Sequence, residues 1–548
     1  MYRRWLLLAY AFVLSVLVLG PALRPGYALT YDMVFTPHES LLPWTLGAGS
    51  ALPRSVPQDA VVAILNIILP GWVLQKIALL AALVLAGFGA ARCVRGPGAW
   101  VAVTLAIWNP FVAERLVQGH WSLLIAYACL PWIVCAASAR RWPVVVVWCA
   151  LAALTPTGGL LAAVIAIPAV LLQPGRRLFK AVWSLAIFAT NLPWLVPALM
   201  HIGSESGGTD VFGLRAEGPW GSVLTAVGLG GIWNGEAVLP SRALWIAPIV
   251  GVAVCTLAAF GWSAFFRRFG RVAGIWLTVS VLGFGLALLS AIAPTLFVAI
   301  TEIPGGGLVR DAQKLLAPLA ILVAVLAGIG IGRVAEKVAD RAVAPSLIVL
   351  TVVIPIATMP DLAFGASGRV SSVAYPSDFE TVREQVGAGV GDAISLPWAA
   401  FRNFDWNGHR TVLDPMPRFL ARSVVADDTL LVGRDGIIQP VGGDDSRAAL
   451  VGSRLAAGEA LTAFGPEMGI EYAVLAHNVA GPDSQAALRG AQVVWEGEEL
   501  SLYWLGEPTA TSSGSDLGLI VVVDILVALV VLASAVLVYF PRKRRFGC

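Results

Sequence analysis

The sequence predicts an α-helical polytopic membrane protein with a small C-terminal extracytoplasmic α/β domain. Of its 548 residues, 58% are hydrophobic and only 13% are charged, and the mean hydropathy is +0.79. A soluble protein of this size could not bury so much apolar surface. Long apolar runs alternate with polar connections through residue 360. From Asp361 the hydropathy falls and the helix and strand periodicities of a soluble domain follow.

Twelve apolar runs predict about 12 transmembrane helices. The runs lie near residues 5–23, 72–91, 97–113, 121–139, 143–155, 158–173, 180–200, 243–263, 273–292, 315–332, 344–360 and 517–540. We expect the first run to be an uncleaved span rather than a signal peptide. If the N-terminus is cytoplasmic, every short inner connection carries at least two basic residues, as the positive-inside rule requires. These residues are Arg3, Arg4, Arg92, Arg95, Arg140, Arg141, Arg176, Arg177, Lys180, Arg267, Arg268, Arg271, Arg333, Lys337, Arg341 and the tail PRKRRFGC. Both termini are therefore expected in the cytoplasm.

Three domains follow from this pattern. Residues 1–360 form a polytopic membrane domain, residues 361–515 an extracytoplasmic α/β domain, and residues 516–548 a final transmembrane helix with a basic cytoplasmic tail. The outer loops 24–71 and 201–242 are too long for simple connections. Each contains an apolar piece too short to cross, AVVAILNIIL and WGSVLTAVGLGGIW, which we expect to lie at the interface or to re-enter the membrane. The expected location is the plasma (inner) membrane.

The extracytoplasmic segment alternates helical and strand patterns, which favours a mixed sheet. SDFETVREQV, DSRAALVGSRLAAGEALTAF and SQAALRG are expected to be helices; DAISLPW, EYAVLAHN, QVVWEG and LSLYWLG are expected to be strands. No glycine-rich phosphate loop opens a helix here, so a nucleotide-binding domain is not predicted. The aromatic-rich segment FRNFDWNGHRTVLDPMPR could stack on sugar rings or be a plain surface loop.

Two outer loops carry charged groups beside aromatic side chains. NPFVAERLVQGHW (109–121) contains Glu114, Arg115 and His120, and GYALTYDMVFTPHES, directly after the first span, contains Asp32. The loops would approach each other if the first four spans form a bundle. A carboxylate flanked by aromatic rings that exclude water is suited to general-base catalysis. Asp32, Glu114 and His120 are also candidate ligands for a divalent cation, or could bind an acceptor hydroxyl.

A third cluster, ITEIPGGGLVRDAQKLLAP (300–318), carries Arg310, Asp311 and Lys314. Arg310 and Lys314 are expected one helical turn apart, where two cations beside a helix start would bind a phosphate. Alternatively they are a snorkelling pair that Asp311 partly neutralises. Lys76 and Arg115 could add charge to this site, or each could be an interface anchor.

Together these features resemble the GT-C glycosyltransferases, and in particular the arabinofuranosyl- and mannosyltransferases of actinobacterial envelopes. The first-loop acid of that family would be Asp32 in LTYDMV and the second-loop acid Glu114 in FVAERL. The resemblance implies transfer of a sugar, arabinofuranose or else mannose, from a polyprenyl-phosphate donor to a glycan or glycolipid acceptor on the outer face, with inversion and Asp32 as general base.

The first loop departs from the family by lacking a paired DD, DE or ED, which leaves metal dependence open. Two rival functions remain. One is a non-catalytic scaffold with a GT-C-like body, and the other is a lipid-linked-sugar transporter or flippase.

Overall fold

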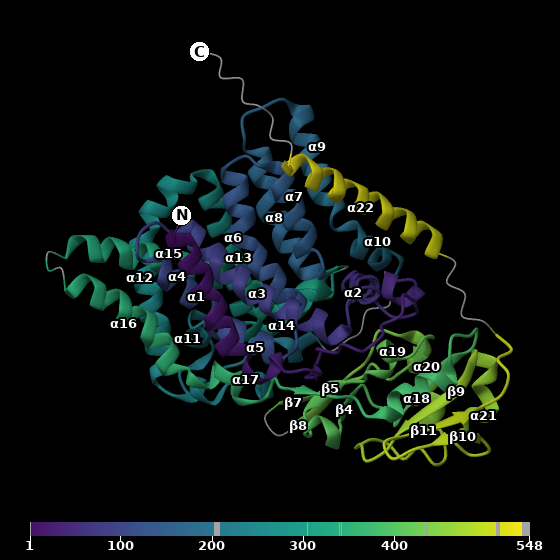
Figure 1. Cartoon of the computed structure of the whole chain (residues 1–548). Helices are drawn as coiled ribbons and strands as arrows, with labels where there is room; N and C mark the ends of the chain where they lie inside the picture. Colours follow the sequence, from purple (N-terminus) through teal and green to yellow (C-terminus); the bar gives the residue numbers. More distant parts are fainter. Residues whose placement is uncertain are drawn as a thin grey trace.

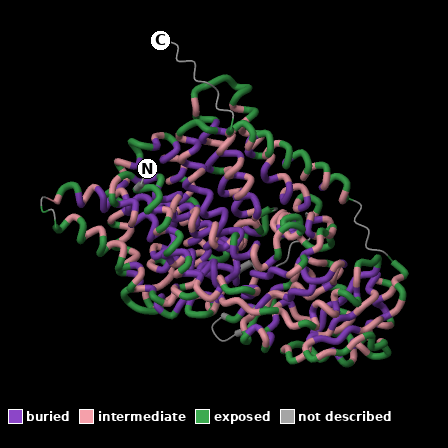
Figure 2. Tube along the Cα trace, viewed as in Figure 1, coloured by how far each residue is buried: buried purple, intermediate pink, exposed green. Residues whose placement is uncertain are grey.

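The computed structural model describes residues 2–201, 209–303, 305–338, 340, 342–434, 437–510 and 516–539. A helical bundle forms the larger part, and the strands of the C-terminal segment lie together at one end of it (Figure 1). Buried positions concentrate within the bundle, whereas α22 (Leu517–Tyr539) runs along its side with mostly exposed positions (Figure 2).

Among the described residues, seven helices are long and apolar enough to cross a membrane. They are α1 (Tyr2–Leu19), α3 (Gly71–Cys93), α6 (Trp121–Ser138), α12 (Ile246–Phe269), α13 (Arg271–Ile292), α15 (Ala317–Lys337) and α22. Two bent pairs raise the count to nine if each pair is one span. One is α9 (Arg177–Ala189) with α10 (Leu192–Met200), bent by 64°; the other is α16 (Val343–Thr358) with the segment Pro360–Ser367, bent by 70°.

The expected count of about twelve spans is therefore not confirmed, although helices occupy all twelve predicted runs. The runs at 143–155 and 158–173 form the shorter helices α7 (Trp142–Ala152) and α8 (Pro156–Leu171), and the run at 97–113 divides into α4 (Ala99–Ile107) and α5 (Pro110–Val117). The Asn109 side chain accepts a hydrogen bond from the Val112 N–H (3.0 Å), and Pro110 takes the first helical position. These residues begin a new helix at that point. A hydropathy average does not register the break.

Short helices occupy both apolar pieces of the long outer loops, as predicted. They are α2 (Gln58–Asn66) and α11 (Gly221–Val227). A third short helix, α14 (Pro294–Thr301), follows α13. The predicted basic tail after Tyr539 lies outside the described residues, as does Arg341.

Helix α15 lies at the centre of the bundle, with most of its residues buried, and packs against α12 and α4. Glycines permit the close crossing with α12. A side chain at Gly330 would collide with the carbonyl oxygen of Leu257, and one at Gly261 would collide with that of Leu326. Small residues at a helix crossing let two backbones approach closely within a membrane.

The C-terminal segment contains a five-stranded mixed sheet in the order β10-β11-β9-β3-β6. Its strands are β3 (Asp392–Leu396), β6 (Val424–Val425), β9 (Ile470–Ala476), β10 (Gln492–Glu496) and β11 (Leu500–Trp504). β3 runs parallel to β6 and β9, whereas β11 is antiparallel to β9 and β10. The same segment contains α18 (Ser377–Val386), α20 (Ser446–Ala456) and α21 (Leu461–Phe464). The four predicted strands are thus present.

Two helix predictions in this segment need correction. The predicted long helix from residue 445 divides into α20 and α21, and Gly458 in the break has a φ of +79°. SQAALRG was expected to be a short helix, but residues 485–490 form turns. Seven residues are too few to stabilise a helix without support from packing.

Two of the three aromatic rings in the aromatic-rich segment, Phe404 and Trp406, pack inward and are not presented for sugar stacking, whereas Phe401 lines a cavity. It forms β4 (Phe401–Asn403) and β5 (Thr411–Leu413), an antiparallel pair, followed by the short α19 (Met416–Phe419). Phe404 is buried and stacks on Trp406 at a centroid distance of 4.9 Å. Both rings pack against Phe379 of α18. These aromatic residues belong to the core because their apolar area is removed from water there.

The C-terminal segment, including this hairpin, also binds the loop that follows α1. β1 (Tyr27–Ala28) pairs with β2 (Ser372–Val373). The Tyr31 N–H donates to the Thr411 carbonyl (2.7 Å), and the Leu413 N–H donates to the Tyr31 carbonyl (2.8 Å). Backbone from the C-terminal segment thus fixes the residue immediately before Asp32.

Candidate active site

The loop that follows α1 and the loop that contains α5 meet at Asp32, which confirms their predicted approach. The Asp32 N–H donates to the Gln118 carbonyl (3.1 Å), and the Thr30 hydroxyl donates to the Val117 carbonyl (3.0 Å). Gly119 has a φ of +84°, and a side chain there would collide with the Met33 backbone. Glycine is therefore required where the loops touch.

Asp32 accepts two side-chain hydrogen bonds on the same oxygen, Oδ2. One comes from His120 Nε2 (3.0 Å) and the other from Gln118 Nε2 (3.0 Å). His120 Nδ1 lies 3.0 Å from an Arg115 guanidinium nitrogen. Arginine only donates, so Nδ1 accepts and the proton of a neutral His120 sits on Nε2, directed at Asp32. The Asp32 side chain remains 36% exposed.

The surroundings leave Asp32 ionised and His120 neutral at pH 7. Burial raises the pKa of Asp32, but the hydrogen bonds from His120 and Gln118 and the charge of Lys314 outweigh it, and the pKa is lowered. Burial and the positive charges of Lys314 and Arg115 lower the pKa of His120 from 6.5 to about 4. A carboxylate able to accept a proton is thus held by a neutral donor.

Arg115 connects this pair to the third predicted cluster. Its guanidinium is fully buried and binds Asp311 through two hydrogen bonds of 2.7 and 2.8 Å. It also donates to Gln313 Oε1 at 2.7 Å through Nε. Lys314 Nζ lies 3.6 Å from Asp311. The charges of Arg115 and Lys314 outweigh burial and hold the pKa of Asp311 well below its usual range. The structure therefore brings all three clusters together.

Contrary to the prediction, Arg310 and Lys314 do not share a helix face. They lie at two successive 3₁₀ segments, η6 (Gly306–Val309) and η7 (Ala312–Leu316), and α15 begins only at Ala317. Asp311 separates the segments with a ψ of 79°, outside the helical region. The Arg310 guanidinium stacks over the Phe212 ring at 4.8 Å.

Glu114 lies behind this group and is fully buried. Its Oε2 accepts hydrogen bonds from the Ile232 N–H (3.0 Å) and from Gln313 Nε2 (3.0 Å). The Gly231 N–H is shared between Glu114 (3.3 Å) and Glu217 (2.6 Å). Burial and the neighbouring Glu217 raise the pKa of Glu114 well above its usual range. Glu114 thus reaches Asp32 only through Gln313, Arg115 and His120.

Lys76 stands apart from the group. It lies in α3, and its ammonium donates to Ser372 (2.8 Å) and Gln75 (3.1 Å). The candidate metal ligands are engaged by other partners, because His120 uses both ring nitrogens and the Glu114 carboxylate accepts from Gly231, Ile232 and Gln313. Within the described ranges, no group of three or more His, Cys, Asp or Glu residues is arranged to hold a metal ion.

Several polar residues of the network were not predicted as site residues. Gln118 and Gln313 lie in the polar stretches 109–121 and 300–318 but are not among the predicted site residues. The sequence signal that could have identified them is that each lies within two positions of a predicted site residue, His120 or Lys314. Glu217 pairs with Arg242 at 2.9 Å, and Asn234 donates to Gln118 at 2.8 Å. Nothing in the local sequence marks these last three.

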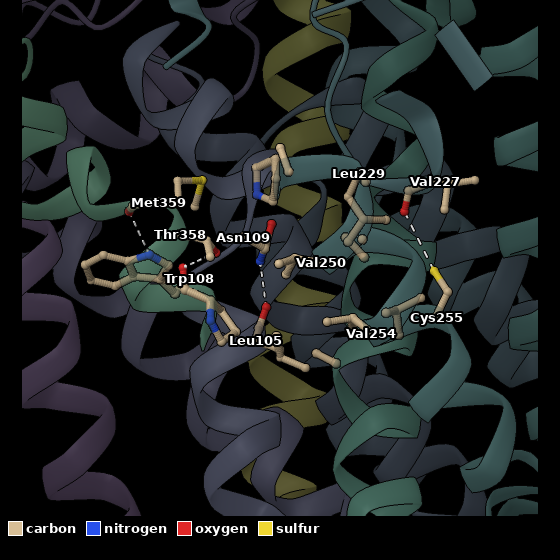
Figure 3. A pocket seen from close by; sticks show the side chains of 18 of the residues that line it. Leu105, Trp108, Asn109, Val227, Leu229, Val250, Val254, Cys255, Thr358 and Met359 are labelled. Carbon is tan, nitrogen blue, oxygen red and sulfur yellow. Dashed lines mark hydrogen bonds between the residues drawn. The ribbon is translucent and has the colours of Figure 1, made fainter. Parts of the chain in front are cut away.

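A mostly apolar pocket of about 60 Å³ lies among α4, α12 and α15 (Figure 3). Trp108 Nε1 donates to the Met359 carbonyl (3.0 Å) on one side, and the Cys255 thiol contacts the Val227 carbonyl (3.7 Å) on another. Arg242, the partner of Glu217, also lines it. The pocket is separate from Asp32.

No protein-family model matches the sequence, and no curated protein does either. Solved structures do match. The mycobacterial arabinofuranosyltransferase AftD aligns with 94% of this chain at a TM-score of 0.56 and 16% identity, and its R1389S mutant aligns with 92% at 0.53 and 16%. The chain has the fold of this arabinofuranosyltransferase. The predicted resemblance to GT-C glycosyltransferases is thereby confirmed for the fold.

The likeness covers nearly all of this chain but only 40% of the AftD chain and 42% of its mutant. ArnT from Cupriavidus metallidurans covers 91% of this chain and 97% of its own at 13% identity, with a TM-score of 0.43. The seven helices that are long and apolar enough to cross a membrane make this a multi-pass membrane protein.

Proposed function

We propose that the protein is a membrane glycosyltransferase that moves a sugar from a polyprenyl-phosphate donor to an envelope glycan or glycolipid. Arabinofuranose is the favoured sugar and mannose the next. The observation that carries the proposal is the partly exposed Asp32 carboxylate, whose Oδ2 is held by His120 and Gln118. Among the described residues both side-chain bonds go to that oxygen, which leaves Oδ1 for an incoming hydroxyl group.

The proposed reaction is a single displacement with inversion. The acceptor oxygen attacks the anomeric carbon, the bond from that carbon to the phosphate oxygen breaks, and the electron pair leaves with polyprenyl phosphate. The hydroxyl proton passes to Asp32. A base positioned in this way contributes about 10²–10⁴-fold to the rate.

The leaving phosphate requires positive charge. Lys314 is 27% exposed at its side chain, and its charge acts on both Asp32 and His120. Arg310 follows η6 and precedes Asp311. We assign these two side chains to the phosphate, because preorganised cations stabilise charge that develops as the bond breaks. Arg115 already binds Asp311 and Gln313, so we assign it to positioning these residues rather than to binding the phosphate.

We also propose how the chain is oriented in the membrane. Asp32 and the segment 361–515 lie on the outer face of the plasma membrane, and both termini are cytoplasmic. Residues 1–360 form the membrane domain, and residues 516–548 form the last span with its tail. The outer face is required because a polyprenyl-phosphate sugar, unlike a nucleotide sugar, is available there.

The test uses purified full-length protein in nanodiscs with polyprenyl-phosphate arabinose or mannose and a short arabinan or mannan acceptor. Wild type is expected to transfer sugar, and Asp32→Asn is expected to lose about 10²-fold or more of that rate. Asp405→Asn is the matched control, since Asp405 also pairs with a histidine, His409 at 3.3 Å, but is 57% exposed at its side chain. An EDTA arm tests the candidate divalent cation.

Transfer by Asp32→Asn at the wild-type rate would remove Asp32 as the base. Absence of transfer from either donor, despite binding of polyprenyl phosphate, would support the scaffold. Movement of a lipid-linked sugar across liposomes without transfer would support the flippase.

A further inference from the structure

A cavity of about 830 Å³ opens beside the candidate base. Tyr31 and Gln118 line it, and these residues are the chain neighbour and a hydrogen-bond partner of Asp32. From there the cavity extends between the helical part and the C-terminal segment. Its volume falls within the range of about 300–1,000 Å³ typical of ligand sites.

Two indoles line this cavity from opposite parts of the chain. Trp233 follows α11, and its ring packs edge-on against Phe212 at 5.1 Å and 85°. Trp398 follows β3, and its indole nitrogen lies close to Gly452 of α20. Both side chains are half-buried, so each is anchored and still contributes surface to the cavity. Rigid aromatic faces complement the C–H faces of sugar rings.

The polar groups of the lining are mostly uncharged. Asn234, Asn403 and Thr429 supply amide and hydroxyl groups. Asp427 and Asp428 are the acids, and Asp428 Oδ2 is occupied by the N–H groups of two residues, Asp444 and Asp445, at 2.7 and 2.9 Å. Within the described ranges, no lysine or arginine lines the cavity.

The cations instead belong to the Arg115–Asp311–Lys314 group. Asp32 therefore lies between a cationic region and a cavity with aromatic, amide and acidic groups. An anionic ligand would be repelled by the Asp427 carboxylate in the cavity lining, whereas an uncharged polyol would not.

We infer that this cavity binds the acceptor as an uncharged oligosaccharide, with Trp233 and Trp398 as stacking surfaces and Asn234 as a positioning residue. Asn234 Nδ2 donates to Gln118 Oε1 at 2.8 Å, and this orients the Gln118 amide so that its nitrogen donates to Asp32. The terminal hydroxyl of the oligosaccharide then reaches Oδ1. This inference rests on the proposed function.

The first test measures acceptor binding without any donor. Full-length protein in nanodiscs is titrated calorimetrically with a neutral arabinan or mannan oligosaccharide. We expect Trp398→Ala to weaken binding about tenfold, and Trp398→Tyr to restore much of it because the tyrosine ring retains a stacking face. Trp5→Ala is the control, because Trp5 is an exposed tryptophan of α1 outside the cavity. Melting temperatures of all variants establish that they fold.

The second test separates the acceptor from the donor during transfer. Trp398→Ala is expected to raise the acceptor KM about tenfold and to leave the donor KM unchanged. Asn234→Ala is expected to lower kcat and to raise the pH of the acid limb of the rate profile, since Gln118 would no longer be held against Asp32. A variant that loses activity only because its fold is destabilised would keep the acid limb of the rate profile at the wild-type pH.

Each outcome decides between the two proposals. Transfer with an unchanged acceptor KM in Trp398→Ala would overturn the cavity assignment while the transferase function stands. Equal or tighter binding of a uronate-containing oligosaccharide would overturn the uncharged class. Trp398-dependent oligosaccharide binding without transfer from any donor would support the cavity and overturn the transferase.

Discussion

At the scale of single residues, three carboxyl groups within one network have three different states. Asp32 is partly exposed, with a lowered pKa. Asp311 is bound by a buried arginine, and its pKa is held far down. Glu114 is buried beside Glu217, with a raised pKa. Only Asp32 combines an ionised carboxylate with access from the outside, which is what a base requires.

The His120 hydrogen bond gives a prediction for the pH profile. Because His120 donates to the carboxylate and lowers the pKa of Asp32, we expect His120→Ala to raise that pKa. The base must be unprotonated, so activity in the variant should be lost at a higher pH as the solution is acidified. His120→Gln, whose amide can donate in the same place, should move the acid limb less. The measurement is kcat/KM for transfer between about pH 3 and 8, which spans the range in which carboxylates and histidine titrate.

The matching control is His409→Ala, at the exposed Asp405–His409 pair. It should leave the acid limb in place. An unchanged limb in His120→Ala would show that His120 does not set the protonation of the base.

At the scale of elements, helix starts and helix crossings shape the site. Asn109 and Pro110 begin α5, which ends just before the Gln118–His120 turn. Gly330 and Gly261 let α12 and α15 cross closely, and α15 follows directly after the segment that holds Asp311, Gln313 and Lys314. The crossing positions α15, and the N-terminal end of α15 adjoins the residues that pair with Arg115.

The crossing can be tested by adding a single methyl group. Gly330→Ala should lower stability by about 1–3 kcal/mol, because the new Cβ would meet the Leu257 carbonyl and the helices would have to separate. Gly332→Ala on the same helix is the control, since a Cβ there meets nothing within 4 Å. Thermal unfolding in detergent measures both. Equal melting temperatures for the two variants would contradict the close crossing.

At the scale of the whole molecule, the C-terminal segment belongs to the site. Its hairpin residues Thr411 and Leu413 hold the backbone of Tyr31. Arg418 of α19 binds Asp59 of α2 at 2.8 Å, with both side chains buried. The first outer loop is thus held by a segment more than 300 residues later in the chain.

Removing the Arg418–Asp59 ion pair should make the loop that carries Asp32 more mobile. Arg418→Met leaves the Asp59 carboxylate buried without its partner, which costs about 3–5 kcal/mol. We expect a lower melting temperature and faster amide exchange at residues 27–33. Arg454→Met is the control, because Arg454 is partly exposed and lies 3.9 Å from Glu459. Unchanged exchange at residues 27–33 in Arg418→Met would show that the loop holds its shape alone.

The sequence by itself determined the membrane class, the places of most helices, four of the five strands of the C-terminal sheet and the two loops that meet at Asp32. These features depend on local hydropathy, caps and periodicity, which are written in consecutive residues. The expected number of spans is not confirmed, because a hydropathy window runs across breaks such as the one at Asn109 and counts shorter helices as spans.

Only the tertiary structure decided which carboxylate is placed to act as the base and which residues bind it. Arg115 and Asp311 lie 196 positions apart, and Glu217 and Arg242 carried no signal in the local sequence. The burial of Glu114, the exposure of Asp32 and the cavity between the two parts of the chain arise from contacts between distant segments. Protonation states follow from those contacts, because desolvation and neighbouring charge depend on position in space rather than on position in the chain.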